Sequence, residues 1–180
     1  MKLHSKGFTI VELLIVIVVI GILAAITIVS YSGISTRAEN TKTISGIEKY
    51  AKALQIYATN TGAYPITSYP CLGPLGSKCS DISSSPTNTC AGSGSATANA
   101  TFDTAIKSVL NTMPELSTQS MDCNGNLYSG AFYSSSNGAS ANINYFLKGD
   151  QPCVAPGGSM LSGRYQATNT TRCSLSLPAF

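Results

Sequence analysis

The sequence is poor in charge and in the residues that most often carry out catalysis. Only 11% of its 180 residues are charged, and its single histidine, His4, lies near the N-terminus. The carboxylates are scattered without a close pair in an apolar setting, and no Gly-rich phosphate-binding loop follows a predicted strand. Because the body of the chain lacks a histidine, it cannot hold a Ser-His or Cys-His nucleophilic pair, and we expect no enzyme activity.

Charge is also absent from one long stretch near the N-terminus, since no charged residue occurs between Leu13 and Thr36. This run is rich in Ile, Val and Leu, and it exceeds the roughly 20 residues that a helix needs to cross a bilayer. It is longer than the apolar core of about 7–15 residues in an ordinary secretory signal. The sequence therefore predicts a membrane-spanning helix, with Lys2 and Lys6 on the cytoplasmic side and the bulk of the chain outside.

A short motif precedes the apolar run: Gly7, then Phe8 and Thr9, then the lone carboxylate Glu12. This order, followed by a hydrophobic helix, resembles the N-terminus of type IV pilins and of the pseudopilins of type II secretion systems, over residues Met1 to Pro65. The resemblance implies that a prepilin peptidase cuts between Gly7 and Phe8, that the new amino group of Phe8 is methylated, and that the subunits polymerise.

Glu12 is open to two interpretations. The resemblance implies that its carboxylate pairs with the Phe8 amino group of a neighbouring copy in the apolar core of a filament, where an unpaired charge would be very costly. A plainer interpretation is an acidic residue at a helix start, placed there because the helix dipole favours it.

The resemblance divides the chain into three parts. They are a leader peptide, 1–7, a hydrophobic transmembrane and assembly helix, 8–30, and a globular head, 31–180. Within the head we expect the second half of the long helix over 31–60, a loop region over 61–125, and a sheet with a C-terminal disulfide loop over 126–180.

Periodicity places the elements of the head. An apolar stripe at helical spacing extends the first helix to about Thr59, and Gly62 and Pro65 then end it. The remaining expected elements are a short helix within Phe102–Met113, strands at Leu127–Tyr133, Asn142–Leu147 and Gly163–Thr168, a hairpin connection over Ser134–Ser140, and a possible strand near Cys173–Leu177. The predicted class is α+β, with the stripe Ile44, Ile47, Ala51, Leu54 and Ala58 packed on a small antiparallel sheet.

The six cysteines all follow the membrane segment. An even number on the exported side indicates a disulfide framework in an oxidising compartment, and the absence of CxxC spacing disfavours zinc. The sequence alone does not choose among the possible pairings. The pilin resemblance implies a C-terminal loop closed by Cys153–Cys173, which leaves Cys71–Cys79 and Cys90–Cys123 as the remaining pairs.

Three further short motifs are considered as a metal-binding loop or as sugar-attachment sites. Oxygen-bearing side chains alternate over Asp122–Asn126, but the twelfth position is Tyr133 and not the Glu of an EF-hand, so we expect a plain turn, no metal and no cofactor. Asn99-Ala-Thr101 and Asn169-Thr-Thr171 fit the acceptor pattern for N-linked sugars.

The functional hypothesis is a structural subunit of a type IV pilus used for adhesion, twitching motility or DNA uptake. The alternatives are a pseudopilin or minor pilin of a secretion or competence system and, from another class, a monomeric membrane-anchored adhesin. Expected partners are other copies of the chain, prepilin peptidase and the pilus assembly machinery. The precursor is expected in the cytoplasmic membrane and the assembled form on the cell surface. Without Lys2 and Lys6, nine of the 11 basic residues face eight acidic ones, which gives no electrostatic case for nucleic acid.

Overall fold

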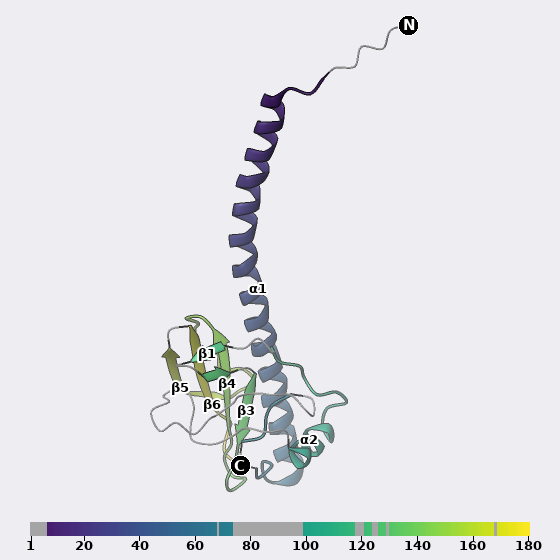
Figure 1. Cartoon of the computed structure of the whole chain (residues 1–180). Coiled ribbons are helices and arrows are strands. Elements are labelled where there is room, and N and C mark those ends of the chain that lie inside the picture. Colours follow the sequence, from purple (N-terminus) through teal and green to yellow (C-terminus); the bar gives the residue numbers. More distant parts are fainter. Residues whose placement is uncertain are drawn as a thin grey trace. The chain divides into compact units, whose positions relative to one another are not determined.

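The computed structural model describes residues 7–67, 69–73, 99–117, 121–123, 126–128, 130–167 and 169–180 (Figure 1). The chain forms two compact units, Met1–Ala38 and Glu39–Phe180, which we call the N-terminal unit and the head. One helix, α1 (Ile10–Thr61), contributes to both units. It confirms the expected long helix, with both ends two residues later than predicted.

Both ends of α1 have a local cause. At its C-terminus, Gly62 has a left-handed φ of +82°, and its N–H donates to the carbonyl oxygen of Ala58 at 2.8 Å. This is the geometry of a glycine cap, which any residue with a Cβ would adopt only with strain. At its N-terminus, the Leu13 N–H donates to the carbonyl oxygen of Thr9 at 3.3 Å, so Thr9 stands at the cap position.

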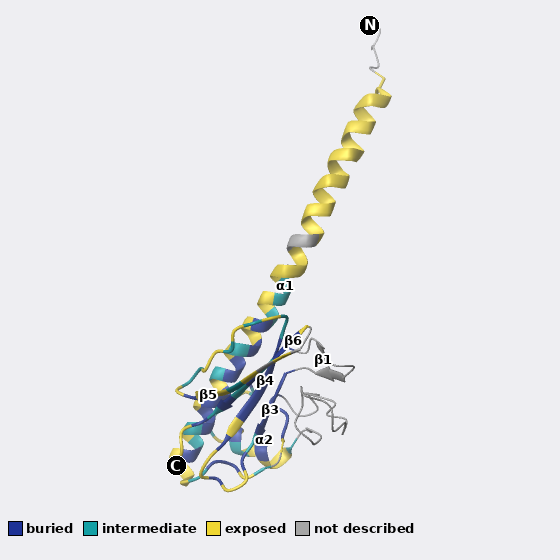
Figure 2. Ribbon diagram, turned by 90° about the vertical axis from the view of Figure 1, so that its left-hand side faces the viewer, coloured by how far each residue is buried: buried dark blue, intermediate teal, exposed yellow. Residues whose placement is uncertain are grey.

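The head is built on one hydrophobic core between α1 and a sheet. Figure 2 shows the buried side of α1 in the head facing the strands. Ile47, Ala51, Leu54 and Ala58 of the predicted stripe are fully buried there, and Ile44 packs partly buried against them. Tyr50 is also fully buried, and its hydroxyl donates to the Pro114 carbonyl oxygen at 3.1 Å, which the stripe did not predict.

The sheet has four antiparallel strands in the order β3-β4-β6-β5. Their bounds are β3 (Ala131–Ser134), β4 (Asn142–Lys148), β5 (Met160–Ala167) and β6 (Thr170–Ser176). The predicted strand Leu127–Tyr133 was wrong as one element. It is divided into β2 (Asn126–Tyr128) and β3 because Gly130, with φ +66°, turns the backbone between them. β2 pairs instead with β1 (Met121–Cys123) in a separate two-stranded sheet.

Both faces of the central strand β4 are buried. Ile143, Tyr145 and Leu147 of β4 join the core on the α1 side. Phe132 and Phe146 lie outside that core cluster, are 1% exposed, and pack with ring centroids 6.2 Å apart. The strand β1 contacts β4 and β6. One face of the sheet was expected on the α1 stripe, and no prediction was made for the other face.

One edge of the sheet, at β3, is occupied by the chain that follows α1. Thr67 and Ser135 exchange two backbone hydrogen bonds of 3.1 Å, and the Leu72 N–H donates to the Ala131 carbonyl oxygen at 2.9 Å. The Tyr133 hydroxyl reaches back to the Pro65 carbonyl oxygen at 2.8 Å. The described parts of this segment, 64–67 and 69–72, are therefore fixed against β3 by main-chain pairing and not by apolar packing alone.

The second helix is shorter than predicted. α2 spans Ala100–Lys107, and the Asn99 side chain caps it by accepting from the Phe102 N–H at 2.9 Å. The predicted extension to Met113 was wrong in backbone geometry, since Ser108 caps the helix and a turn follows. The periodic residues after the turn still pack against the core, so burial and not helix continuation explains their spacing.

Asn40 joins α1 to the end of β4. Its Nδ2 donates to the Lys148 carbonyl oxygen at 3.0 Å, and its Oδ1 accepts from the Lys148 N–H at 2.9 Å. The residue is 7% exposed. Replacement by Ala should lower the free energy of unfolding by about 1–3 kcal/mol, because two half-buried backbone groups lose their partner. Denaturant titration of the full chain in micelles measures this, with exposed Ser45→Ala as the control; equal effects of the two variants would contradict it.

Asp103 on α2 is a buried carboxylate with one unpaired oxygen among the described residues. It is 4% exposed, and its Oδ2 has no hydrogen-bond partner among the described residues. Burial raises the pKa of this carboxyl, and the Lys107 cation on the next turn lowers it by less. Because the folded pKa lies above the unfolded value of about 3.9, ionisation at neutral pH destabilises the fold, and this penalty vanishes as the pH falls toward the unfolded value.

We therefore expect Asp103→Asn to raise the free energy of unfolding at pH 7 by about 1 kcal/mol, since an amide is cheaper to bury than a charge. The gain over the parent chain should shrink as the pH is lowered toward 4. Thermal unfolding at both pH values measures it. The control is Asp150→Asn, which removes the exposed ion pair with Arg164 and should not stabilise. A gain that is independent of pH would contradict the buried-charge explanation.

Candidate functional site

The candidate site of the N-terminal unit is the start of α1, where the predicted residues Gly7, Phe8 and Glu12 lie. The Thr9 N–H and the Thr9 hydroxyl both donate to Glu12 Oε2 at 2.8 Å, and the Glu12 N–H donates to Thr9 Oγ1 at 3.2 Å. This reciprocal arrangement is a capping box, in which a Thr and a Glu three residues later satisfy the free N–H groups of a helix start. Glu12 therefore has an intramolecular role.

The capping box was missed in the sequence analysis, although its signal is the Thr-x-x-Glu spacing itself. It uses only one carboxylate oxygen. Glu12 Oε1 has no hydrogen bond within the described part of the chain, and Phe8 is 77% exposed. The peptide group of Thr9 lies after the expected cleavage site, so a cut between Gly7 and Phe8 would leave the capping box intact. Glu12 can thus cap its own helix and still offer an oxygen to a cation outside the chain.

The surface behind this site is apolar on all sides. α1 includes one segment long and apolar enough, by length and composition, to cross a membrane. Figure 2 shows its described residues as exposed. The large exposed side chains are Ile10, Val11, Leu13, Leu14, Ile15, Val16, Ile17, Val18, Val19, Ile20, Ile22, Leu23, Ile26 and Ile28. A continuous apolar surface of this length requires lipid or other protein as its surroundings.

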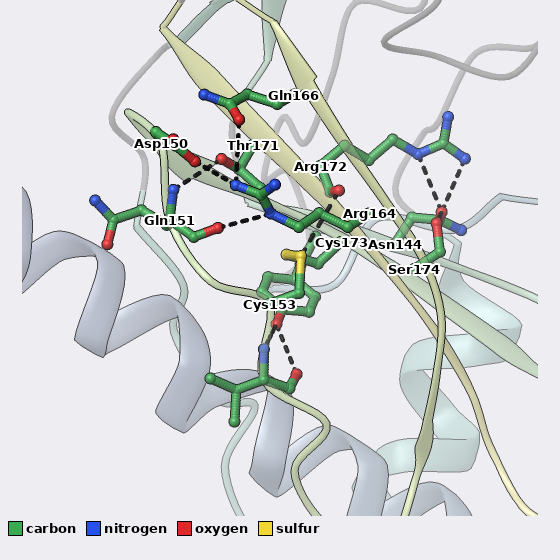
Figure 3. Close-up of a disulfide and its surroundings, with 12 residues drawn as sticks. Asn144, Asp150, Gln151, Cys153, Arg164, Gln166, Thr171, Arg172, Cys173 and Ser174 are labelled. Carbon is green, nitrogen blue, oxygen red and sulfur yellow. Dashed lines mark hydrogen bonds and ion pairs between the residues drawn. A yellow bond between two sulfur atoms is a disulfide. The ribbon is translucent and has the colours of Figure 1, made fainter.

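The C-terminal loop is closed by a disulfide between Cys153 and Cys173, 20 residues apart, with Cα atoms at 5.5 Å (Figure 3). This is the pair that the resemblance implied. Cys173 lies on β6 and is fully buried, opposite Tyr145 on β4. The Tyr145 hydroxyl donates to the Val154 carbonyl oxygen at 2.7 Å and accepts from the Val154 N–H at 2.9 Å. Val154, which follows Cys153 in the chain, is thus held to β4 independently of the disulfide.

Polar contacts extend around the same loop. Arg164 on β5 forms an ion pair with Asp150, and its Nε donates to the Gln151 carbonyl oxygen at 3.1 Å (Figure 3). The Gln55 side chain on α1 donates to the Gly157 carbonyl oxygen at 2.5 Å. The loop between Gly149 and Ser159 is therefore attached to the sheet on one side and to α1 on the other.

The other cysteine predictions fall largely outside the described residues. Cys71 is disulfide-bonded, to a cysteine whose side chain is not among those described. Cys79 and Cys90 lie outside the described residues, as does the side chain of Cys123, so the pairs Cys71–Cys79 and Cys90–Cys123 stay predictions.

The segment Asp122–Asn126, which was compared above with the calcium-binding loop of an EF-hand, has strands on both sides. β1 and β2 are antiparallel, with Cys123 opposite Asn126, so the segment connects two strands and lacks the flanking helices of an EF-hand. Within the described ranges, no group of three metal-ligating side chains occurs. The expectation of no metal remains a prediction.

The two sugar-acceptor patterns have different surroundings. The side-chain Oδ1 of Asn99 is used as the cap of α2, where it accepts from the Phe102 N–H. Asn169 is exposed beside the turn between β5 and β6, whereas Thr171, which completes its pattern, is buried and donates to the Gly149 carbonyl oxygen at 2.7 Å.

Comparisons with known proteins concern the N-terminal third. A family described as "Prokaryotic N-terminal methylation motif" matches residues 2–28. The chain is 35% identical over 66 residues, 37% of its length, to the type II secretion system core protein G of Aeromonas hydrophila, and covers 46% of that protein. It is 35% identical over 63 residues, 35% of its length, to the protein of the same name in Escherichia coli K12, and covers 43% of it.

A type IV major pilin gives a similar match. Identity to the protein PilE of Neisseria gonorrhoeae is 38% over 65 residues, 36% of this chain and 39% of that pilin. The chain thus spans less than half the length of the curated relatives it matches. No solved structure matches it. The expected resemblance is confirmed: the N-terminus carries the prepilin-type motif, the relatives are secretion pseudopilins and pilins, and both are structural subunits and not enzymes.

Proposed function

We propose that this chain is a type IV pilus subunit, cut between Gly7 and Phe8, methylated on Phe8 and polymerised through α1 into a helical filament. The observation that supports this most directly is the combination of the methylation motif at residues 2–28 with an α1 segment whose apolar side chains are exposed all round. The precursor is anchored in the cytoplasmic membrane by that segment, with the head outside. The filament carries the head on the cell surface.

Glu12 is the proposed registration residue. In a filament core made of apolar α1 segments, an unpaired carboxylate would be destabilising, whereas a carboxylate next to the Phe8 amino group of another copy is neutralised. The capping box supports this role, because it fixes the position of the carboxylate and leaves Oε1 available. Lipid tails are as apolar as the helices, so packing and this ion pair, and not hydrophobic burial, would decide the register.

The partners follow from this pathway. They are prepilin peptidase, which acts at Gly7–Phe8, the assembly machinery of the inner membrane, and other copies of the chain. The head needs no cofactor for such a role. Its disulfide-closed loop suits a domain exported to an oxidising compartment.

A pseudopilin of a type II secretion system is the second candidate. The matches to core protein G, at 31–36% identity over 63–67 residues, are about as long as the 65-residue match to PilE. The candidates differ in phenotype: loss of a pilus subunit removes surface fibres, whereas loss of a pseudopilin blocks secretion of an exported enzyme. A monomeric anchored adhesin, the third candidate, predicts that exchanges at Phe8 and Glu12 have no consequence.

The test is intact mass and N-terminal sequencing of protein sheared from the cell surface. We expect a chain that begins at Phe8, carries one added methyl group and sediments as fibres. The mass also counts the oxidised cysteines, since each disulfide removes two hydrogens. A chain that begins at Met1, or one cut after the apolar segment, would overturn the proposal.

A further inference from the structure

A polar cleft of about 190 Å³ lies on the head, between the segment that follows α1 and the β3–β4 connection. The described residues that line it are all polar, and none of them is charged. They are Thr67, Tyr69, Ser134, Ser135, Ser136, Ser140 and Asn142. None of these residues is part of the N-terminal unit or the disulfide loop, so the proposed assembly does not account for the cleft.

Two residues on one wall of this cleft, Thr67 and Tyr69, have energetically unfavourable features. Among the described residues, Tyr69 alone of the non-glycine residues has a positive φ, +53°, a conformation that disfavours any side chain. The Thr67 hydroxyl is buried and has no hydrogen-bond partner among the described residues. Backbone strain and unsatisfied polar groups concentrate at functional positions, where the surrounding structure sustains them.

The surrounding structure holds this wall rigidly. Thr67 and Ser135 exchange backbone hydrogen bonds of 3.1 Å, and the Tyr69 ring packs edge-on against Phe132 with centroids 5.8 Å apart. The Ser135 hydroxyl donates to the Ser140 carbonyl oxygen at 2.6 Å and so fixes the opposite wall. Tyr69 keeps 36% of its surface exposed. The cleft is thus preformed, with a partly exposed aromatic ring at its rim.

The lining selects one class of ligand. The described lining offers no charged side chain to pair with an ion, and the single ring of Tyr69 is too little apolar surface for a hydrophobic ligand. Hydroxyl and amide groups both donate and accept, which matches a ligand that presents many hydroxyls of its own. An aromatic ring beside such groups packs on the C–H face of a sugar ring. We propose that this cleft binds a neutral monosaccharide unit, free or at the end of a glycan. This inference does not depend on filament assembly.

The test titrates the full chain with neutral hexoses and N-acetylhexosamines, and with glucuronic acid as a charged comparison. The protein is held in a zwitterionic detergent, because a glycoside detergent would itself offer a sugar. Ligand-observed NMR should show saturable binding of at least one neutral sugar at about millimolar affinity, which is ordinary for so small a contact. Absence of binding by every neutral sugar, or binding of glucuronic acid alone, would overturn the proposal.

Three variants assign the binding to this cleft. Tyr69→Gly removes the ring, so affinity should fall at least about tenfold, while relief of the positive φ offsets part of the stability lost with the Phe132 contact. A folded variant is verified by its near-UV circular dichroism before titration. Ser136→Ala removes an exposed lining hydroxyl and should weaken binding by less. Ser162→Ala, on exposed β5, is the matched control and should bind like the parent chain. Binding that survives both cleft variants would place the sugar elsewhere and overturn the assignment.

Discussion

Replacement of Glu12 by Gln should abolish most fibre formation while leaving cleavage and membrane insertion intact. Gln at this position can still accept from Thr9, since a capping box is formed by Glu or Gln, but it cannot neutralise a neighbouring amino group. If Glu12 registers subunits through charge, the Phe8 amino group is left unpaired in an apolar core. We expect the yield of sheared fibres to fall on the order of a hundredfold, because an unpaired buried charge is strongly destabilising.

The reverse variant is Thr9→Ala, which removes the cap hydroxyl and keeps the carboxylate. It should reduce fibre yield far less than Glu12→Gln, and Glu12→Ala should resemble Glu12→Gln. Fibre yield is measured by shearing and sedimentation, and processing by the N-terminal sequence of the membrane fraction. Normal fibres from Glu12→Gln together with few fibres from Thr9→Ala would show that the capping box, and not the charge, is what assembly requires.

The second large effect concerns the disulfide between Cys153 and Cys173. The double variant Cys153→Ala/Cys173→Ala should lower the free energy of unfolding of the head by about 3 kcal/mol, the chain-entropy value for a loop of 20 residues. Both cysteines are exchanged together so that no lone thiol remains. Thermal unfolding of the full chain in micelles, followed by near-UV circular dichroism, measures the change.

The double variant keeps the hydrogen bonds that hold the loop on either side of the disulfide. Tyr145 holds Val154 by two hydrogen bonds, and Gln55 holds Gly157, so the loop keeps partners when the covalent link is absent. We therefore expect the variant to fold, and to lose stability mainly through a less restricted unfolded state. The control is Tyr145→Phe, which removes the Val154 contact and should cost about 1–2 kcal/mol. A double variant as stable as the parent chain would contradict the prediction.

The parts of the fold that were predicted depend on patterns within one segment. The stripe from Ile44 to Ala58 has helical spacing, and Gly62 ends the helix, so α1 was correct to within two residues. The hairpin connection with Asn137-Gly138 was also correct: Asn137 Oδ1 accepts from the Ala139 N–H at 3.1 Å, and Gly138 has φ +74°. Turn chemistry of this kind involves neighbours only.

The predictions that were wrong extended a regular spacing across a local turn. The break between β2 and β3 lies at Gly130, which has a positive φ, and α2 ends at Lys107 because Ser108 caps it, although apolar spacing continues beyond both positions. The burial of the Phe146 ring outside the α1 core was not predicted, because alternation along β4 gives two faces without saying what covers either.

The sequence by itself determined the N-terminal motif, the apolar α1 segment, the stripe that anchors the head and the α+β class. These features can be recognised from residue spacing and composition within a single helix or strand. Only the tertiary structure decided that Asn40 meets Lys148, that Cys153 meets Cys173, and that neutral side chains from two segments enclose a cleft beside the strained Tyr69. Each of these joins residues far apart in the chain, and such pairings follow from the packing of the whole head.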